Sequence, residues 1–155
     1  MGLSHDLALG TFLDSVTKMV LRRKDILENK AQISSFIKSY NREHLESKIS
    51  ESYFDNIENW PPTGATLEKL AAVGNCAQFE MPIPLNVSYL ANVSYAGLQT
   101  KVMRYLYTRQ VGGKQDGQHY ERQPTDLTFQ ELLNICASAQ FAAFFHLQQK
   151  VELVL

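Results

Sequence analysis

The sequence predicts a fold that combines helices with at least one short β-strand, and an all-helical fold is the alternative. Two observations indicate helices, because apolar residues recur at three- and four-residue spacing in residues 6–28 and again in residues 92–107. A third observation indicates a strand, because apolar residues occupy every second position of residues 81–87. The prolines between them cannot donate to a central ladder, so this strand is expected at a sheet edge.

The bulk composition is that of one ordinary globular domain. The chain has 155 residues, with 15 basic and 16 acidic side chains and a net charge of −1. No basic field is present for nucleic acid, and no apolar run reaches the roughly 18 residues that span a bilayer. Without a signal peptide, Cys76 and Cys136 are expected to be reduced thiols in a cytoplasmic or nuclear protein.

The first half of the chain predicts helices with one ambiguous segment. Residues 31–40 permit either a short strand or a helix, and residues 43–56 are expected to be helical. A proline-rich break follows at residues 60–64, and a short helix over residues 67–73 is expected to be closed by Gly74 in the left-handed conformation. The apolar face of the residue 6–28 helix consists of Leu9, Phe12, Leu13, Val16 and Val20.

The second half contains the clearest helix signals. Asn92 or Ser94 can cap the residue 92–107 helix, and a polar, glycine-rich loop follows over residues 109–125. Thr128 and Glu131 form a capping box, after which two helices are expected, the second around residues 142–150. The stripe expected to be buried in the residue 92–107 helix consists of Leu98, Val102, Tyr105 and Leu106.

Catalytic signals are weak. Cys76 is the strongest candidate, because a cysteine entering a helix after Gly74 could be stabilised as a thiolate, as in a cysteine hydrolase or deamidase. The downstream histidines, His119 and His146, lie in a loop and in an apolar helix, where neither is placed to act as its base. The histidine spacings fit no metal site, and no phosphate-binding glycine loop is found. The chain is therefore expected to be no enzyme and to need no metal or cofactor.

Residues 92–149 resemble the C-terminal half of a BTB/POZ domain, the fold shared with elongin C. The resemblance is carried by a short strand, a helix ending in a Tyr-Leu-Tyr-Thr sequence, a loop and a helix pair, which here read IPLNV, NVSYAGLQTKVMRYLYT and LTFQELLNICASAQFAAFFHLQQKVE. In the first half, His44 and the sequence SYF of residues 52–54 are similar to a family helix pair. The resemblance implies an α+β fold, with helices packed around a small β-sheet over residues 25–150.

The function that the resemblance implies is non-enzymatic protein–protein interaction. Family members dimerise, and many act as adaptors of cullin-type ubiquitin ligases, so a homodimer and a cullin-3 partner are expected. The N-terminal helix, residues 1–24, would then be the dimer interface through the apolar face described above, although that face could equally cover its own core. An unrelated helical partner-binding domain is the further alternative. The cullin-binding surface implied for this chain consists of Tyr53, Phe54, Val111, Tyr120 and Glu121.

Overall fold

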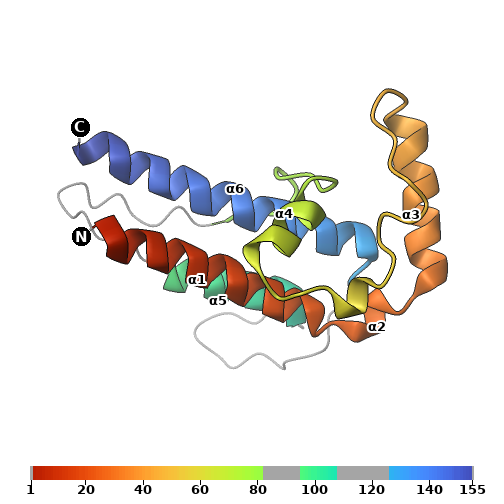
Figure 1. The fold of residues 1–155 in the computed structure, drawn as a ribbon, viewed down its shortest axis with the longest axis horizontal. Coiled ribbons are helices and arrows are strands. Elements are labelled where there is room, and N and C mark those ends of the chain that lie inside the picture. Colours follow the sequence, from red (N-terminus) through yellow and green to blue (C-terminus); the bar gives the residue numbers. More distant parts are fainter. Residues whose placement is uncertain (1, 82–94, 108–125, 155) are drawn as a thin grey trace, which may run out of the picture.

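The computed structural model describes residues 2–81, 95–107 and 126–154, and every regular element within these ranges is a helix. Figure 1 shows α1 and α6 as two long antiparallel helices, with α1 beginning and α6 ending at the same end of the molecule. The elements are α1 (Gly2–Leu21), α2 (Lys24–Leu27), α3 (Lys30–Glu43), the 3-10 helix η1 (Ile57–Asn59), α4 (Gly64–Ala71), α5 (Ala96–Tyr107) and α6 (Phe129–Val154).

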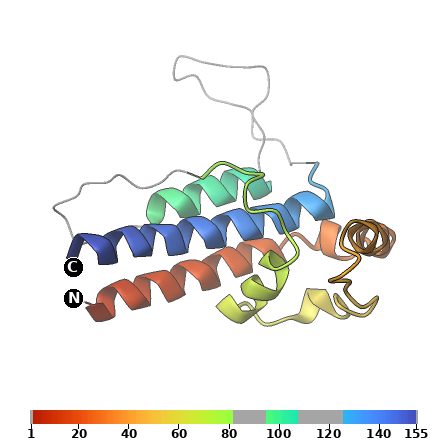
Figure 2. The same cartoon turned by 90° about the horizontal axis from the view of Figure 1, so that it is seen from above.

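Helix α6 is the centre of the packing. It contacts α1, α4 and α5, while α1 also contacts α4 and α5, so these four helices enclose the core. Figure 2 shows α1, α5 and α6 as roughly parallel rods, with α3 seen end-on beside the start of α6. The largest fully buried aliphatic side chains at their contacts include Leu67, Leu70, Leu98, Leu106, Leu132, Leu133 and Ile135.

The predicted α+β fold is wrong for the described part of the chain, where the all-helical alternative fits. Residues 31–40 belong to α3, because the Asn29 side chain accepts a hydrogen bond from the Gln32 N–H at 3.1 Å and caps the helix. The buried Phe36 and Ile37 then lie one turn after the partly buried Ile33, which is helical spacing. The predicted strand over residues 81–87 lies almost entirely outside the described residues.

The helix predicted over residues 43–56 is also wrong. Helix α3 ends at Glu43, and the chain turns back through bonds from the Asn41 side chain to the N–H and C=O of Ile49, at 2.8 and 3.0 Å. Asn56 takes the left-handed backbone conformation at φ 57°, which no α-helix contains. Leu45, which lies in this segment, has 70% of its surface exposed. Side-chain bonds to the backbone have replaced the helical ladder here.

The helix predicted over residues 6–28 is interrupted near Arg23. This residue is buried, donates a hydrogen bond to the carbonyl of Leu106 on α5, and forms an ion pair with Asp25 at 2.8 Å. Arg23 also lies over the Tyr107 ring, with its guanidinium carbon 5.8 Å from the ring centroid. Because the helix is interrupted here, the guanidinium of Arg23 can connect the end of α1 to the end of α5.

The Arg23–Asp25 pair predicts a small dependence of stability on pH. The hydrogen bond from Arg23 lowers the pKa of Asp25, so the carboxylate contributes its full stabilisation above the ordinary aspartate pKa. That contribution is lost as the pH falls through the lowered native pKa. Because 66% of the Asp25 side chain is exposed and therefore screened, Asp25→Asn should cost no more than about 1 kcal/mol at pH 7.

Urea unfolding of the wild type and of Asp25→Asn between pH 7 and pH 2 measures this contribution. The difference in free energy of unfolding should shrink steadily below about pH 4 and vanish in strong acid. If the difference in free energy of unfolding stays constant over the whole pH range, the charge of Asp25 does not stabilise the junction between α1 and α5.

In the second half, the predicted helix is confirmed over residues 96–107, while the predicted caps Asn92 and Ser94 and the loop of residues 109–125 lie outside the described residues. In α5, Leu98, Val102 and Leu106 are fully buried, while Tyr105 is partly buried and donates to the Glu80 carbonyl at 2.7 Å. The capping box is present, since the Thr128 hydroxyl accepts from the Glu131 N–H at 3.1 Å and the Glu131 carboxylate accepts from the Thr128 N–H at 2.9 Å.

The two helices predicted after the capping box are one continuous helix, α6, of 26 residues. Its start is fastened to α3, because the N–H of Phe129 donates to the Gln32 side chain at 2.8 Å. No glycine or proline interrupts the run, so the ladder continues through residues 139–142 where a break was expected. None of the described helices combines the length and the apolar composition that spanning a bilayer requires.

Candidate interaction surface

From its middle to its C-terminal end, α6 exposes a stripe of large apolar side chains. Phe141 and Phe144 have 56% and 47% of their surfaces exposed, Phe145 has 36%, and Val151 has 50%. Positions 141, 144, 145 and 151 fall close to one face of a helix, while Ala139, among others, is buried on the opposite face. Helix α6 is therefore apolar on two faces, and only one of them is covered by α1, α4 and α5.

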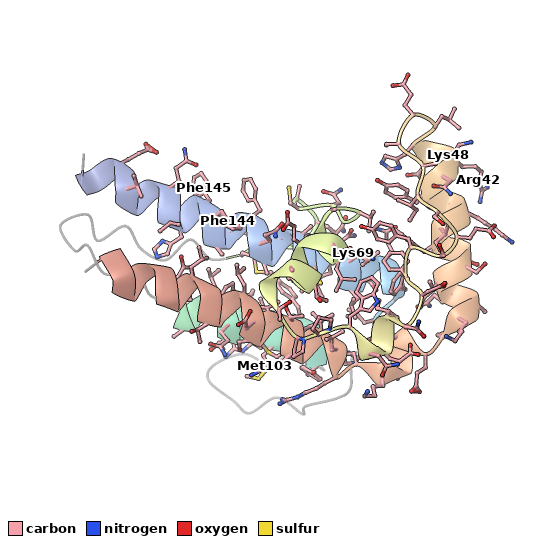
Figure 3. The ribbon with its side chains drawn as sticks, in the orientation of Figure 1. Arg42, Lys48, Lys69, Met103, Phe144 and Phe145 are labelled. Atoms are coloured by element: carbon pink, nitrogen blue, oxygen red, sulfur yellow. The ribbon has the colours of Figure 1, made fainter. Side chains whose placement is uncertain are left out.

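This stripe borders a hollow of about 420 Å³ between α6 and the end of α4. The small residues Ala71, Gly74 and Ala137 line the hollow beside the three phenylalanines, and the amides of Gln140 and Gln148 complete its α6 side. We call this hollow, with Phe141, Phe144 and Phe145, the aromatic groove. Figure 3 shows Phe144 and Phe145 projecting from α6, and Met103 on α5 at the opposite side of the view.

Gly74 permits the close approach that shapes the groove. A Cβ atom added at this position would lie 2.2 Å from the carbonyl oxygen of Leu133 and 3.1 Å from the Cβ of Ala137. The predicted left-handed conformation of Gly74 is wrong, because its φ lies outside the left-handed range. The glycine is needed here for the space that it leaves beside the backbone of α6, rather than for its backbone conformation.

The chain after Gly74 is held to α6 by polar bonds. The N–H of Asn75 donates to the Asn134 side chain at 2.8 Å, and the hydroxyl of Ser138 donates to the carbonyl of Cys76 at 3.1 Å. Both α6 side chains are buried, so these bonds satisfy polar groups that would otherwise be costly there. They fix Cys76 at the edge of the aromatic groove.

The two thiols of the chain have different environments. Cys76 is exposed and lies in a turn, and no helix begins at it, so the predicted stabilisation by free helical N–H groups is absent. Cys136 is fully buried in α6, and burial raises the pKa of its thiol to about 12. Alkylating reagents should therefore reach Cys76 and leave Cys136 unmodified.

A second hollow of about 590 Å³ lies on the other side of the Gly74 turn and shares Gly74 and Cys76 with the groove. Its far wall comes from α3 and from His44, which directly follows that helix, and the rings of Tyr40 and His44 stack there with centroids 3.9 Å apart. His44, which precedes Cys76 in the chain, is thus the histidine that shares a hollow with it. Sequence reasoning considered only the downstream histidines.

Neither downstream histidine lies in a described hollow with Cys76. His146 is buried in α6 against the Tyr95 ring, with centroids 5.5 Å apart, and His119 lies outside the described residues. No group of three or more histidine, cysteine or acidic side chains in the described ranges is placed to hold a metal ion.

The cullin-binding residues expected from the resemblance do not form a described surface. Phe54 is buried, where its ring contacts Phe129 at a centroid distance of 4.9 Å. Tyr53 is partly buried, and its hydroxyl donates to the carbonyl of Lys69 at 2.7 Å. The ammonium of Lys69 lies 4.2 Å from the ring centroid of Trp60, which covers the same corner. The other three predicted contacts, Val111, Tyr120 and Glu121, lie outside the described residues.

The residues expected at a dimer interface mostly face the chain's own core. Phe12, Val16 and Val20 are buried, and the Phe12 ring stacks on Tyr95 with centroids 5.1 Å apart. Leu9 and Leu13 are partly buried against the same core. Helix α1 therefore places its apolar face against α4, α5 and α6. Among the described residues, most of the large apolar side chains that are exposed lie on α6 instead.

Comparisons with known proteins find a partial relative. The chain is 33% identical over 112 residues to a tRNA N6-adenosine threonylcarbamoyltransferase from a Nitratiruptor species, a match that covers 70% of this chain and 29% of that protein. The chain therefore spans less than a third of the length of that relative. No protein-family model and no solved structure matches the chain.

Proposed function

We propose that this chain is a helical, non-enzymatic interaction module that contributes to the transfer of a threonylcarbamoyl group to adenosine in tRNA. The proposed part in tRNA modification is supported by the similarity to a tRNA threonylcarbamoyltransferase, which is 33% identical over 112 residues, or 70% of this chain. The observation that supports the interaction role is the aromatic groove, whose phenylalanines remain exposed although the chain has its own core.

The chemistry of the groove supports binding. Apart from the thiol of Cys76, its lining consists of aromatic rings, small aliphatic side chains and the amides of Gln140 and Gln148. General acid–base catalysis uses an imidazole, carboxylate, amine, phenol or thiol, and among the described lining side chains only the thiol of Cys76 belongs to this set. An apolar centre of phenylalanine rings bordered by the neutral amides of Gln140 and Gln148 is the arrangement found in many protein–protein interfaces.

The test is the threonylcarbamoyladenosine content of tRNA, measured by mass spectrometry of digested nucleosides. In cells that lack this chain, the modified nucleoside should fall relative to cells that produce it, and a plasmid copy should restore it. Pseudouridine in the same digests is the control and should not change. An unaltered threonylcarbamoyladenosine content in the cells that lack the chain would contradict the proposed process.

Adaptor function in a cullin-type ligase is a second proposal, supported by the helix of residues 96–107. This helix ends in the Tyr-Leu-Tyr part of the sequence that resembles a BTB/POZ domain, and Leu98, Val102 and Leu106, which helical spacing places in the core, are buried there. Its test is size-exclusion chromatography with light scattering of the chain alone and with a cullin-3 N-terminal fragment. Co-elution with the cullin would support this proposal, and separate elution at a monomer mass would contradict it.

A further inference from the structure

Another hollow, of about 450 Å³, lies between α3 and residues 51–57, which follow that helix in the chain. One wall belongs to α3 and carries the side chains of Lys30 and Lys38, which are eight residues and about 12 Å apart along the helix axis. The other wall carries the side chains of Glu51 and Asp55. We call this space, with these four side chains, the charged hollow.

The floor of the charged hollow is apolar. Ile37, Phe54 and Ile57 line it, and each has no more than 5% of its surface exposed. The Phe54 ring packs edge-on against Phe129, with centroids 4.9 Å apart, so the floor is continuous with the core. An apolar floor below a few polar groups is the usual composition of a small-molecule site, and 450 Å³ is an ordinary volume for one.

Both walls of the charged hollow are held in place by contacts within the chain. One link is made by the Asn41 side chain, which bonds to the N–H and C=O of Ile49 at 2.8 and 3.0 Å. Another is the edge-on contact between the rings of Phe36 and Phe54, with centroids 6.0 Å apart. A ligand would therefore enter a hollow that already has its shape, which lowers the entropy cost of binding.

The charges of the hollow are left without partners in the described part of the chain. All four charged side chains named above are exposed, and none of them forms an ion pair or a side-chain hydrogen bond within the described ranges. Lysine ammonium groups lie at the ends of flexible four-carbon stems, so they can move toward a ligand. A ligand with a single charge could pair with one wall only, whereas a ligand with both charges could pair with both walls.

We propose that the charged hollow binds a free α-amino acid with an apolar side chain, in its zwitterionic form. The carboxylate of this ligand pairs with the two lysines, its ammonium pairs with the two acidic side chains, and its side chain lies on the apolar floor. A residue inside a peptide has neither charge and a terminal residue has only one, so a free amino acid matches both walls best. The charged hollow shares no lining residue with the aromatic groove, and its ligand is independent of the proposed part in tRNA modification.

An NMR titration of the isotope-labelled chain with L-leucine tests this site. The amide signals of residues 30–38 and 51–57 should shift, with a Kd on the order of 1 mM because the paired charges are exposed to solvent. L-leucinamide keeps only the ammonium and N-acetyl-L-leucine keeps only the carboxylate, as at the two ends of a peptide. Each should bind at least about fivefold more weakly than L-leucine.

Two variants that each remove one charge test the two walls separately. Lys38→Met should weaken the binding of L-leucine and N-acetyl-L-leucine by about threefold and leave that of L-leucinamide unchanged. Asp55→Asn should weaken the binding of L-leucine and L-leucinamide and leave that of N-acetyl-L-leucine unchanged. The matched control is Lys48→Met, because Lys48 is an exposed lysine in the turn after α3 (Figure 3) that does not line the hollow, and it should leave all three affinities unchanged.

Three results would overturn the proposed amino-acid site. The first is the absence of shifts in these amide signals at L-leucine concentrations up to about 20 mM. The second is equal affinity for L-leucine and for the two probes with a single charge, and the third is equal affinity of Lys38→Met and Lys48→Met for L-leucine. The spectra of the variants without ligand show at the same time that each protein is folded.

Discussion

Replacing Phe129 by alanine should lower the free energy of unfolding by about 3–5 kcal/mol, the usual cost of removing a buried phenylalanine. Phe129 is fully buried at the first turn of α6, with its ring edge-on to Phe36 at 5.5 Å and to Phe54 at 4.9 Å between centroids. These contacts join α6 to α3 and to the segment before η1. Without the ring, the contacts that join α6, α3 and the segment before η1 would be lost and a cavity would remain. Urea unfolding followed by circular dichroism measures the decrease in the free energy of unfolding.

The matched control is Phe141→Ala on the same helix. Because 56% of Phe141 is exposed, its removal should change the free energy of unfolding of the isolated chain by no more than about 0.5 kcal/mol. Equal losses for the two variants would mean that Phe141 is part of the folding core and that the stripe on α6 is not a free surface.

Replacing Gly74 by alanine should cost at least about 3 kcal/mol, at the upper end of what overpacking costs. The added Cβ would meet the carbonyl carbon of Leu133 at 2.6 Å and its oxygen at 2.2 Å, and neither backbone atom can rotate away. The turn would have to move off α6, which would break the Asn75–Asn134 bond and deform the aromatic groove. Thermal unfolding and the alkylation rate of Cys76 report the two effects.

The control for Gly74 is Gly10→Ala in the middle of α1. A Cβ at Gly10 would meet nothing within 4 Å, so alanine should raise stability by about 0.5–1 kcal/mol through its higher helix propensity. A Gly74→Ala protein as stable as the wild type would show that α6 and the turn do not approach each other as closely as described.

The helices could be predicted where a local pattern determines them. The stripe of α5 and the capping box of α6 depend on residues within a few turns of one another, so the sequence carries the whole signal. The end of α3 could not be predicted in this way, because Asn41 reaches eight residues along the chain to Ile49. The expected sheet came from the family resemblance and from the apolar alternation of residues 81–87, which lie almost entirely outside the described residues. The segment between α3 and η1, which was expected to be helical, turns through side-chain bonds instead.

The candidate site was harder to predict, because exposure is a tertiary property. Phe144 lies in the helix predicted around residues 142–150, and its exposure could not be predicted because a phenylalanine at helical spacing is more often buried than exposed. Nothing within α6 shows that α1, α4 and α5 cover only one of its two apolar faces. In the same way, Phe12, Val16 and Val20 form an apolar face that suits an interface as well as a core, and only the packing of α1 distinguishes the two.

The most direct test of the account compares Phe144→Asp with Met103→Asp as the only source of this chain in cells, with the threonylcarbamoyladenosine content of tRNA as the readout. Both side chains are exposed, on α6 and α5 respectively, so both variants should fold with wild-type stability. Phe144→Asp should lower the modified nucleoside to the level of cells without the chain, while Met103→Asp should maintain it. A wild-type level with a folded Phe144→Asp protein would contradict the claim that the aromatic groove is the working surface of this protein.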